Sequence, residues 1–154
     1  VKKEISLLED RLTELVKDHQ QKQLTLLKTI PGMGTKTAIM LIVMTDGFNK
    51  FENSKQLCSY AGITPTIRHS GSSVRGKSRI SKMGNQKMRN LLFLCSFSAC
   101  KYNKGCCDLY KRIVSKGKSK KLALIAVSNK LLKQAFAIAK SGLPYDDNFV
   151  STLK

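Results

Sequence analysis

A basic segment rich in serine and glycine, residues 65–89, interrupts the apolar pattern of this chain and limits where a core can form. It reads PTIRHSGSSVRGKSRISKMGNQKMR and contains no acidic residue. Clusters of serine and glycine between periodic apolar segments are typical of loops and not of buried elements. The core must therefore come from the flanking regions, and the segment is predicted to be a loop able to hold a phosphate backbone.

Apolar residues on both sides of this loop recur at helical spacing, and strand-like alternation is weak throughout. Glycine- and proline-containing breaks separate predicted helices at residues 1–27, 34–44, 54–61, 85–99, 107–114 and 120–140. The 154 residues, 42% of them hydrophobic, suffice for one domain with a real core. We therefore predict an all-α fold: a coiled-coil-like helix at 1–27, a helical domain at 28–145 and an irregular tail at 146–154.

The first predicted helix carries a short heptad seam. Its apolar positions are Val1, Ile5, Leu8, Leu12 and Leu15. His19 and Lys22 occupy the next seam positions and weaken it. The pattern fits self-association into a dimer or tetramer and packing on the chain's own domain equally well.

The charge of the chain is high and unevenly distributed. The formal net charge is +18, and Asp108 is the only acid between Pro65 and Lys121. Lys116, Lys118, Lys120 and Lys121 add a basic entrance to the last helix. Surfaces that serve only solubility usually mix signs, so this bias favours a polyanion partner, DNA above all, over a merely solvated surface.

The cysteines and the apolar runs bear on the compartment. The five cysteines form no CxxC pair, so neither a zinc site nor a disulfide framework is predicted. We expect no metal-binding residues in this chain. We expect no signal peptide and no run of membrane-spanning length. The chain is expected to work in a reducing cytoplasm, and because it starts at Val1 inside a helical pattern we expect it to be a fragment of a longer protein.

The segment Ile30-Pro31-Gly32-Met33-Gly34 resembles the helix-hairpin-helix motif. In such a turn the glycines let the backbone approach a phosphate, and the N–H groups of the next helix point at it. Lys36 and Thr37 could add a charge and a hydroxyl. We predict contacts to the nucleic-acid backbone from Gly32, Gly34, Lys36 and Thr37. The alternative is a tight glycine turn between two packed helices.

The loop itself holds the candidate nucleophile. Its sequence Ser70-Gly71-Ser72-Ser73 lies among bases that could meet the charge building on an attacked phosphate. The residues predicted to contact nucleic acid are Arg68, His69, Gly71, Arg75, Lys77, Arg79, Lys82, Lys87 and Arg89. No carboxylate lies in the loop, and His69 is the nearby imidazole. On spacing alone the loop is a phosphate-binding element.

The order IPGMG, KFENSKQLCSYAGITP, the serine–glycine loop and ISKMGNQKMRNLL resembles the C-terminal transposase domain of the DEDD/serine insertion-sequence recombinases. That family includes the Piv-type invertases and the bridge-RNA-guided transposases. The resemblance implies a serine that becomes linked to DNA phosphate, here Ser70 by position. Ser72 and Ser73 lie so close that a slip of one or two residues in this correspondence would choose the wrong serine.

The resemblance also implies partners outside this chain. A RuvC-like half with four acids would bind a divalent metal, expected to be Mg²⁺, and its acids are not found in this sequence. The isolated chain is therefore expected to bind DNA without completing strand exchange. A structured guide RNA is a candidate partner, and the expected location is the nucleoid of a bacterium or archaeon. The competing interpretations are a non-catalytic helix-hairpin-helix module and an oligomerisation domain.

Overall fold

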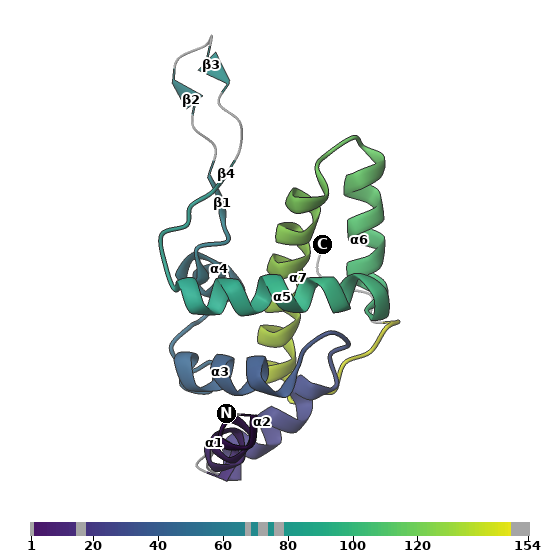
Figure 1. Cartoon of the computed structure of the whole chain (residues 1–154). Coiled ribbons are helices and arrows are strands. Elements are labelled where there is room, and N and C mark those ends of the chain that lie inside the picture. The colour runs from purple at the N-terminus through teal and green to yellow at the C-terminus, as the bar shows by residue number, and fades with distance from the viewer. Residues whose placement is uncertain (1, 15–17, 67–68, 71–73, 76–78, 149–154) are drawn as a thin grey trace.

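A computed structural model describes residues 2–14, 18–66, 69–70, 74–75 and 79–148 (Figure 1). The helices are α1 (Lys2–Glu14), α2 (Asp18–Lys28), α3 (Thr35–Thr45), α4 (Ser54–Ala61), α5 (Gln86–Tyr102), α6 (Lys104–Ser115) and α7 (Lys120–Ser141). The strands are β1 (Pro65–Thr66), β2 (His69–Ser70), β3 (Val74–Arg75) and β4 (Arg79–Ile80). The predicted all-α fold is confirmed, because the strands are confined to one narrow arm.

Helix α7 forms the centre of the helical body. It packs against α5, α6, α4 and α2, and crosses α5 in the middle of the body (Figure 1). Leu131 and Leu132 of α7, Leu92 of α5 and Leu27 of α2 are fully buried. Each such side chain contributes about 1.5–3 kcal/mol by leaving water. The body is therefore held mainly by contacts between helices that are distant in the sequence.

The helix ends follow local sequence signals. Side chains of Asn53, Asn85 and Ser119 accept hydrogen bonds from the first turns of α4, α5 and α7. Gly62 and Gly142 end α4 and α7 at φ 70° and 69°, in the left-handed conformation that glycine adopts without strain. The predicted helices at 34–44, 54–61 and 120–140 are confirmed to within a residue or two. The helices predicted at 85–99 and 107–114 are longer than predicted.

Asn103 explains why α5 and α6 exceed their predicted bounds. Its side-chain oxygen accepts from Cys106 N at 3.1 Å, which starts α6 directly after α5 ends at Tyr102. Its amide donates to Gln134 Oε1 at 3.0 Å, and Tyr145 Oη donates to its Oδ1 at 3.0 Å. This buried residue thus ties α6, α7 and the segment after α7 together.

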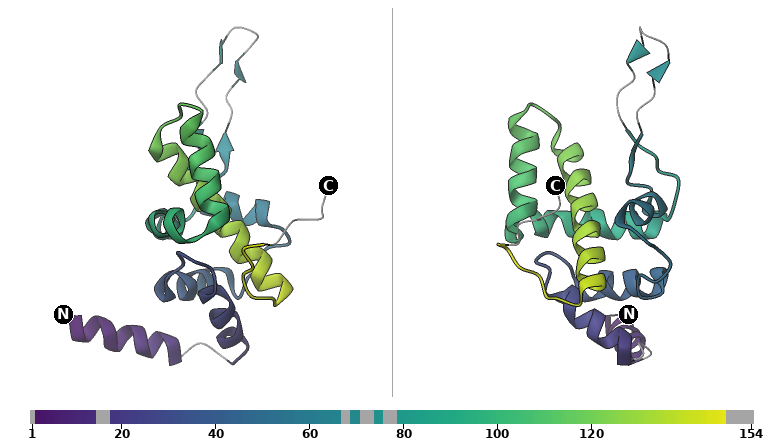
Figure 2. Two further views of the ribbon diagram at one scale, coloured as in Figure 1. Left: turned by 90° about the vertical axis from the view of Figure 1, so that its right-hand side faces the viewer. Right: turned by 180° about the vertical axis from the view of Figure 1, so that it is seen from behind.

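The single helix predicted over residues 1–27 is wrong in this form, since α1 and α2 are separate helices. In the left panel of Figure 2, α1 points away from the body at an angle to α2. Leu24 and Leu27 of α2 join the core, whereas Ile5 and Leu8 of α1 are 45% and 61% exposed. The physical reason is that the two halves have different surroundings: α2 packs on the body, whereas Ile5 and Leu8 of α1 stay exposed.

The expectation that no apolar run reaches membrane-spanning length is also corrected. Helix α7 has 22 residues and a mean hydropathy of 1.4 over its most apolar part. Several of its apolar residues, among them Ala123, Val127, Ala135 and Ile138, are buried against the other helices. The hydropathy of α7 is thus that of a core helix in a helical body.

Within the segment predicted as a loop, the described residues form four short strands that pair as an arm. Pro65 pairs with Ile80 and Thr66 with Arg79 in the lower ladder. The upper ladder joins β2 to β3, and the arm extends away from the helical body in every view (Figures 1 and 2). Each ladder is two residues long, too short to leave the alternation that predicts strands from sequence.

Candidate nucleic-acid interface

The base of the arm is bound to the body by backbone hydrogen bonds. Asn85 N donates to Tyr60 O at 2.7 Å, and Lys82 N donates to Gly62 O at 3.1 Å. These bonds join the end of α4 to the segment that enters α5. The strands that lead to the candidate nucleophile therefore start from a fixed place.

Arg89 and Gly84 complete this base. Arg89 Nη1 donates to Ala61 O at 3.1 Å, close to where a side chain at Gly62 would lie. Gly84 has φ 141°, and a Cβ there would collide with the carbonyl group of Tyr60. Only glycine permits so close an approach. The residues that carried the family resemblance at 60–65 and 80–89 thus meet in space, and Arg89 has a structural role beside its predicted contact with nucleic acid.

The candidate nucleophile lies in the upper ladder. Ser70 pairs with Val74, and His69 pairs with Arg75, in antiparallel register. Both strands lie at the far end of the arm in Figure 1. The predicted site residues Arg68, Gly71 and Lys77 lie outside the described residues, as do the alternatives Ser72 and Ser73.

The Ile30–Gly34 turn connects α2 to α3, and its first glycine faces inward. Gly32 has φ 95°, and a Cβ there would come within 2.6 Å of the backbone of Ala99 in α5. Gly34 is exposed and meets nothing within 4 Å. The glycine at position 32 is therefore required by helix packing, which is the alternative left open from the sequence.

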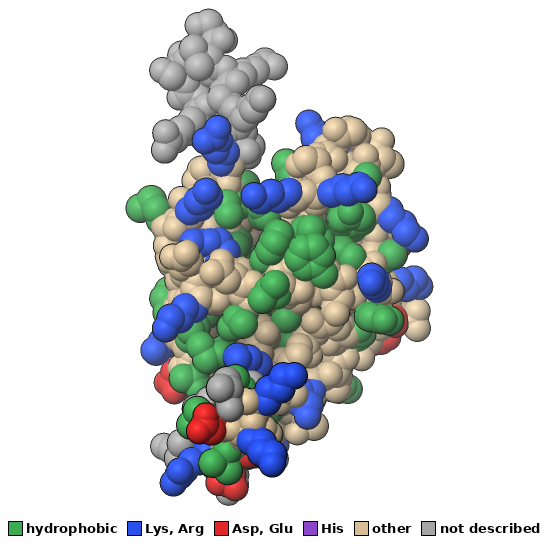
Figure 3. Space-filling view, in the orientation of Figure 1, with side chains coloured by type: hydrophobic (Ala, Val, Ile, Leu, Met, Phe, Trp, Pro, Cys, Tyr) green, Lys and Arg blue, Asp and Glu red, His purple; other side chains and the backbone are tan. Residues whose placement is uncertain are grey.

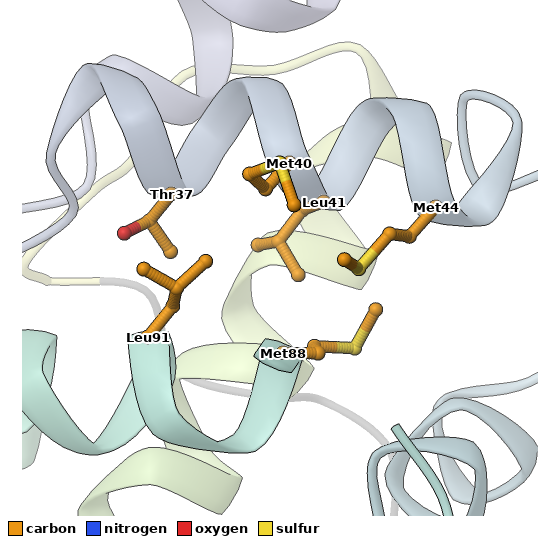
Figure 4. A pocket seen from close by; sticks show the side chains of 6 residues that line it. All are labelled: Thr37, Met40, Leu41, Met44, Met88 and Leu91. Atoms are coloured by element: carbon orange, nitrogen blue, oxygen red, sulfur yellow. The ribbon is translucent and has the colours of Figure 1, made fainter. Parts of the chain in front are cut away.

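Thr37 and Lys36 follow each other in α3 but differ in burial. Thr37 is buried and its Oγ1 lies 3.2 Å from Cys95 Sγ, whereas Lys36 is exposed. Figure 4 shows the inward face of α3 against α5; it is lined by Thr37, Met40, Leu41, Met44, Met88 and Leu91. The exposed groups of this turn that could reach a phosphate are thus Gly34 and Lys36, and their contact with nucleic acid stays a prediction.

A wide groove runs between the arm base and the first half of α7. It encloses about 1220 Å³, and apolar side chains form its floor. The floor residues are Ile63, Ile80, Phe93, Leu109, Leu122, Ile125 and Ala126. Its basic side chains are Lys55, Arg79, Lys82, Arg89, Lys121, Lys130 and Lys133. No acid belongs to this lining among the described residues, and Figure 3 shows the apolar surface surrounded by basic side chains.

The groove is lined both by basic residues that were predicted to contact nucleic acid and by basic residues that were not. Arg79, Lys82 and Arg89 were predicted from the loop. Lys121 belongs to the basic entrance of α7, while the missed Lys130 and Lys133 lie farther along it. A signal existed, because residues three apart share a face of a helix. No sequence signal pointed to Lys55 on α4, since only the tertiary fold brings α4 beside α7. Lys87 is exposed in the first turn of α5 but is not part of the groove.

Two buried thiols can be set aside as nucleophiles. Burial raises the pKa of Cys106 to about 12, although the charge of Lys130 acts in the opposite direction. Burial also raises the pKa of Cys58, again against a nearby lysine, Lys133. A thiol reacts as its thiolate, so both groups are inert near neutral pH. No cluster of three His, Cys, Asp or Glu that could hold a metal occurs in the described part of the chain.

Comparison with known proteins gives the class to which this fold and surface belong. The Transposase IS116/IS110/IS902 family matches residues 24–111, and the chain belongs to this family. The match begins inside α2, where the core of the body also begins.

Individual relatives agree with this assignment. The chain is 35% identical to the pilin gene-inverting proteins of Moraxella lacunata and Moraxella bovis over 152 residues. Each match covers 89% of this chain and 46% of the relative. An insertion element IS110 protein of Streptomyces coelicolor is 28% identical over 139 residues, covering 90% of this chain and 34% of that protein. The chain thus spans about half, or less, of the relatives it matches.

Proposed function

We propose that this chain is the part of a DNA transposase or site-specific recombinase that holds DNA and supplies the serine nucleophile, Ser70. The observation that carries the proposal is the position of Ser70 in a chain of this family. It lies on a strand at the far end of an arm, beyond a body whose adjacent groove is lined by bases. A serine held away from the body can reach a DNA backbone that the body binds.

Ser70 would carry out a transesterification, in which a DNA phosphate moves from a sugar oxygen to the serine oxygen. Its Oγ forms a bond to phosphorus while the bond from phosphorus to one sugar oxygen breaks. The serine proton passes to a base, and the departing sugar oxygen takes up a proton. Arg75, paired to the neighbouring His69, and Arg79 in the lower ladder supply positive charge along the arm. Since the phosphate ester is kept, the reverse step can join a different strand.

We place the expected metal chemistry in another part of the full-length protein. The described residues offer no cluster of acids that fits a divalent cation. We infer that the acids which bind Mg²⁺ come from a RuvC-like half, and that this chain alone binds DNA without exchanging strands. Formation of a covalent DNA adduct by the isolated chain with Mg²⁺ would contradict this.

A covalent-trapping assay on the full-length protein tests the nucleophile. Ser70→Ala is expected to abolish the protein–DNA adduct on a cognate DNA end, whereas Ser72→Ala and Ser73→Ala keep it. These two serines are matched controls because they share the loop and the chemistry of Ser70. An adduct that survives Ser70→Ala and is lost with Ser72→Ala or Ser73→Ala would move the assignment to that serine.

Helix α1 provides the proposed contact between copies. Ile5, Leu7 and Leu8 are 45%, 64% and 61% exposed, which is costly for a helix without a partner. Pairing with α1 of a second copy would cover them and bring two arms to one DNA. Leu8→Glu is expected to lower the mass measured by sedimentation, and an unchanged mass would contradict the proposed pairing. A guide RNA remains a candidate partner of the assembled protein, which would act in the cytoplasm of a bacterium or archaeon.

A further inference from the structure

We propose that the groove between the arm base and α7 binds a single-stranded stretch of nucleic acid, with its bases on the apolar floor and its phosphates against the basic rim. The inference rests on the proposed function and specifies which form of nucleic acid this surface takes. It concerns a place on the helical body, separate from the upper ladder of the arm that holds Ser70.

The charge of the groove selects a phosphate-bearing occupant. Lys55 from α4, Lys82 from the arm base, and Lys121 and Lys133 from α7 line it, and all four are exposed. The described lining holds no acid that would pair with them. These positively charged lysines come from three separate elements and repel each other while the groove is empty. An occupant with spaced negative charges relieves that repulsion.

The floor of the groove decides between double and single strands. Phe93 and Ile125 are half-buried at the floor, and Leu122 is 43% exposed. A duplex turns its phosphates outward and hides its bases, so it would press charge onto an apolar surface. A single strand offers the faces of its bases to apolar and aromatic side chains while its phosphates reach the rim.

The aromatic surface continues beyond the groove along α5. The rings of Phe93 and Phe97 meet edge to face with centroids 5.3 Å apart, and Phe97 is 49% exposed. Residues four apart lie on the same face of a helix, so this pair extends the apolar surface along the helix. An unpaired strand leaving the groove would find a second ring on its path. Strand exchange creates unpaired strands of this kind.

The test compares binding of short labelled oligonucleotides to the chain by fluorescence anisotropy. The probes are a 12-nucleotide dT strand, a 12-nucleotide U strand and a hairpin duplex. Lys55→Gln combined with Lys133→Gln should weaken single-strand binding and lower the salt slope by about 1.4, since each phosphate that a lysine neutralises adds about 0.7 to that slope. Lys28→Gln combined with Lys50→Gln is the matched control, since both lysines are exposed, lie outside the groove and carry the same charge.

A second variant addresses the floor alone. Phe93→Leu keeps an apolar side chain but removes the ring, and should weaken single-strand binding about fivefold or more, as expected when one base no longer stacks on an aromatic side chain. Duplex binding should stay unchanged. Thermal unfolding of each variant checks that the body remains folded. A preference for dT or for U assigns the strand as DNA or RNA.

The outcomes separate this inference from the proposed function. If the groove variants bind single strands as the unaltered chain does, or lose single and double strands equally, the inference is wrong while DNA binding stands. If the unaltered chain binds none of the three probes, the proposed function fails with it.

Discussion

The arm and the helical body are stabilised in opposite ways. The body buries side chains such as Leu92 and Leu131 completely, in contacts between distant helices. The arm has ladders of two residues, and its described lower residues Pro65, Thr66 and Arg79 are exposed. A two-stranded hairpin is at best marginally stable alone. The comparison teaches that the body anchors the arm at its base and leaves its far end accessible.

The largest effect is expected from a change inside the body. Gly32→Ala places a Cβ within 2.6 Å of the Ala99 backbone at a φ of 95°, so both packing and the backbone are strained. We expect the free energy of unfolding to fall by about 3 kcal/mol in urea titrations followed by circular dichroism. Gly34→Ala is the control: a Cβ there meets nothing, and its cost should stay below about 1 kcal/mol. Equal losses would refute the packing role of Gly32.

A smaller effect is expected where the arm meets the body. Gly84→Ala collides with the Tyr60 carbonyl group and should break the bond from Asn85 N to Tyr60 O. We expect a loss of about 2 kcal/mol and faster hydrogen exchange at the Asn85 amide. Gly117→Ala is a control with a positive φ of 73° and no nearby atoms. If both variants exchange alike at Asn85, the base does not fix the arm.

The body should also respond to alkaline pH through a buried thiol. The pKa of Cys106 is raised by burial from 9.0 to about 12, so between these values the folded state keeps a proton that the unfolded state loses. The contribution of the Cys106 thiol to the free energy of unfolding is therefore fully present below pH 9. It decreases as the pH rises toward 12. Urea titrations at pH 8 and 10 should show a smaller decrease for Cys106→Ala than for the unaltered chain. A decrease of the same size would exclude Cys106 as its source.

The smallest effect is expected in the arm itself. Thr66 Oγ1 donates to Arg79 O at 2.9 Å on an exposed ladder. Thr66→Val keeps the branched shape and removes this bond, so we expect a change of about 0.5 kcal/mol or less in global unfolding. Hydrogen exchange should increase locally within the lower ladder. A clear drop in global stability would show that the arm contributes to the body's core after all.

Part of the fold was predictable because its signals are local. Asn53 and Asn85 cap the helices predicted at 54–61 and 85–99, and Gly142 ends the helix predicted at 120–140. The hairpin was not predictable as strands, since two-residue ladders leave no alternation to detect. The split between α1 and α2 was missed for another reason: a heptad pattern does not state which partner covers it.

The candidate site divides in the same way. Arg79, Lys82 and Arg89, which line the groove, were among the predicted contacts because they lie close together in the sequence. The opposite side of the groove, with Lys130 and Lys133, was not, because only the packing of α4, α5 and α7 brings it there. The roles predicted for Gly34, Lys36, Ser70 and the other loop residues remain predictions.

By itself the sequence determined most of the helices, the basic character of the chain and the serine–glycine segment that resembles the transposase family. These properties depend on neighbours in the chain, and short-range hydrogen bonding and charge decide them. The tertiary structure alone decided that Gly32 closes against α5, that Gly84 and Arg89 anchor an arm, and that bases from separate elements share one groove. Such contacts join residues far apart in the chain, so they exist only once the core has placed the helices.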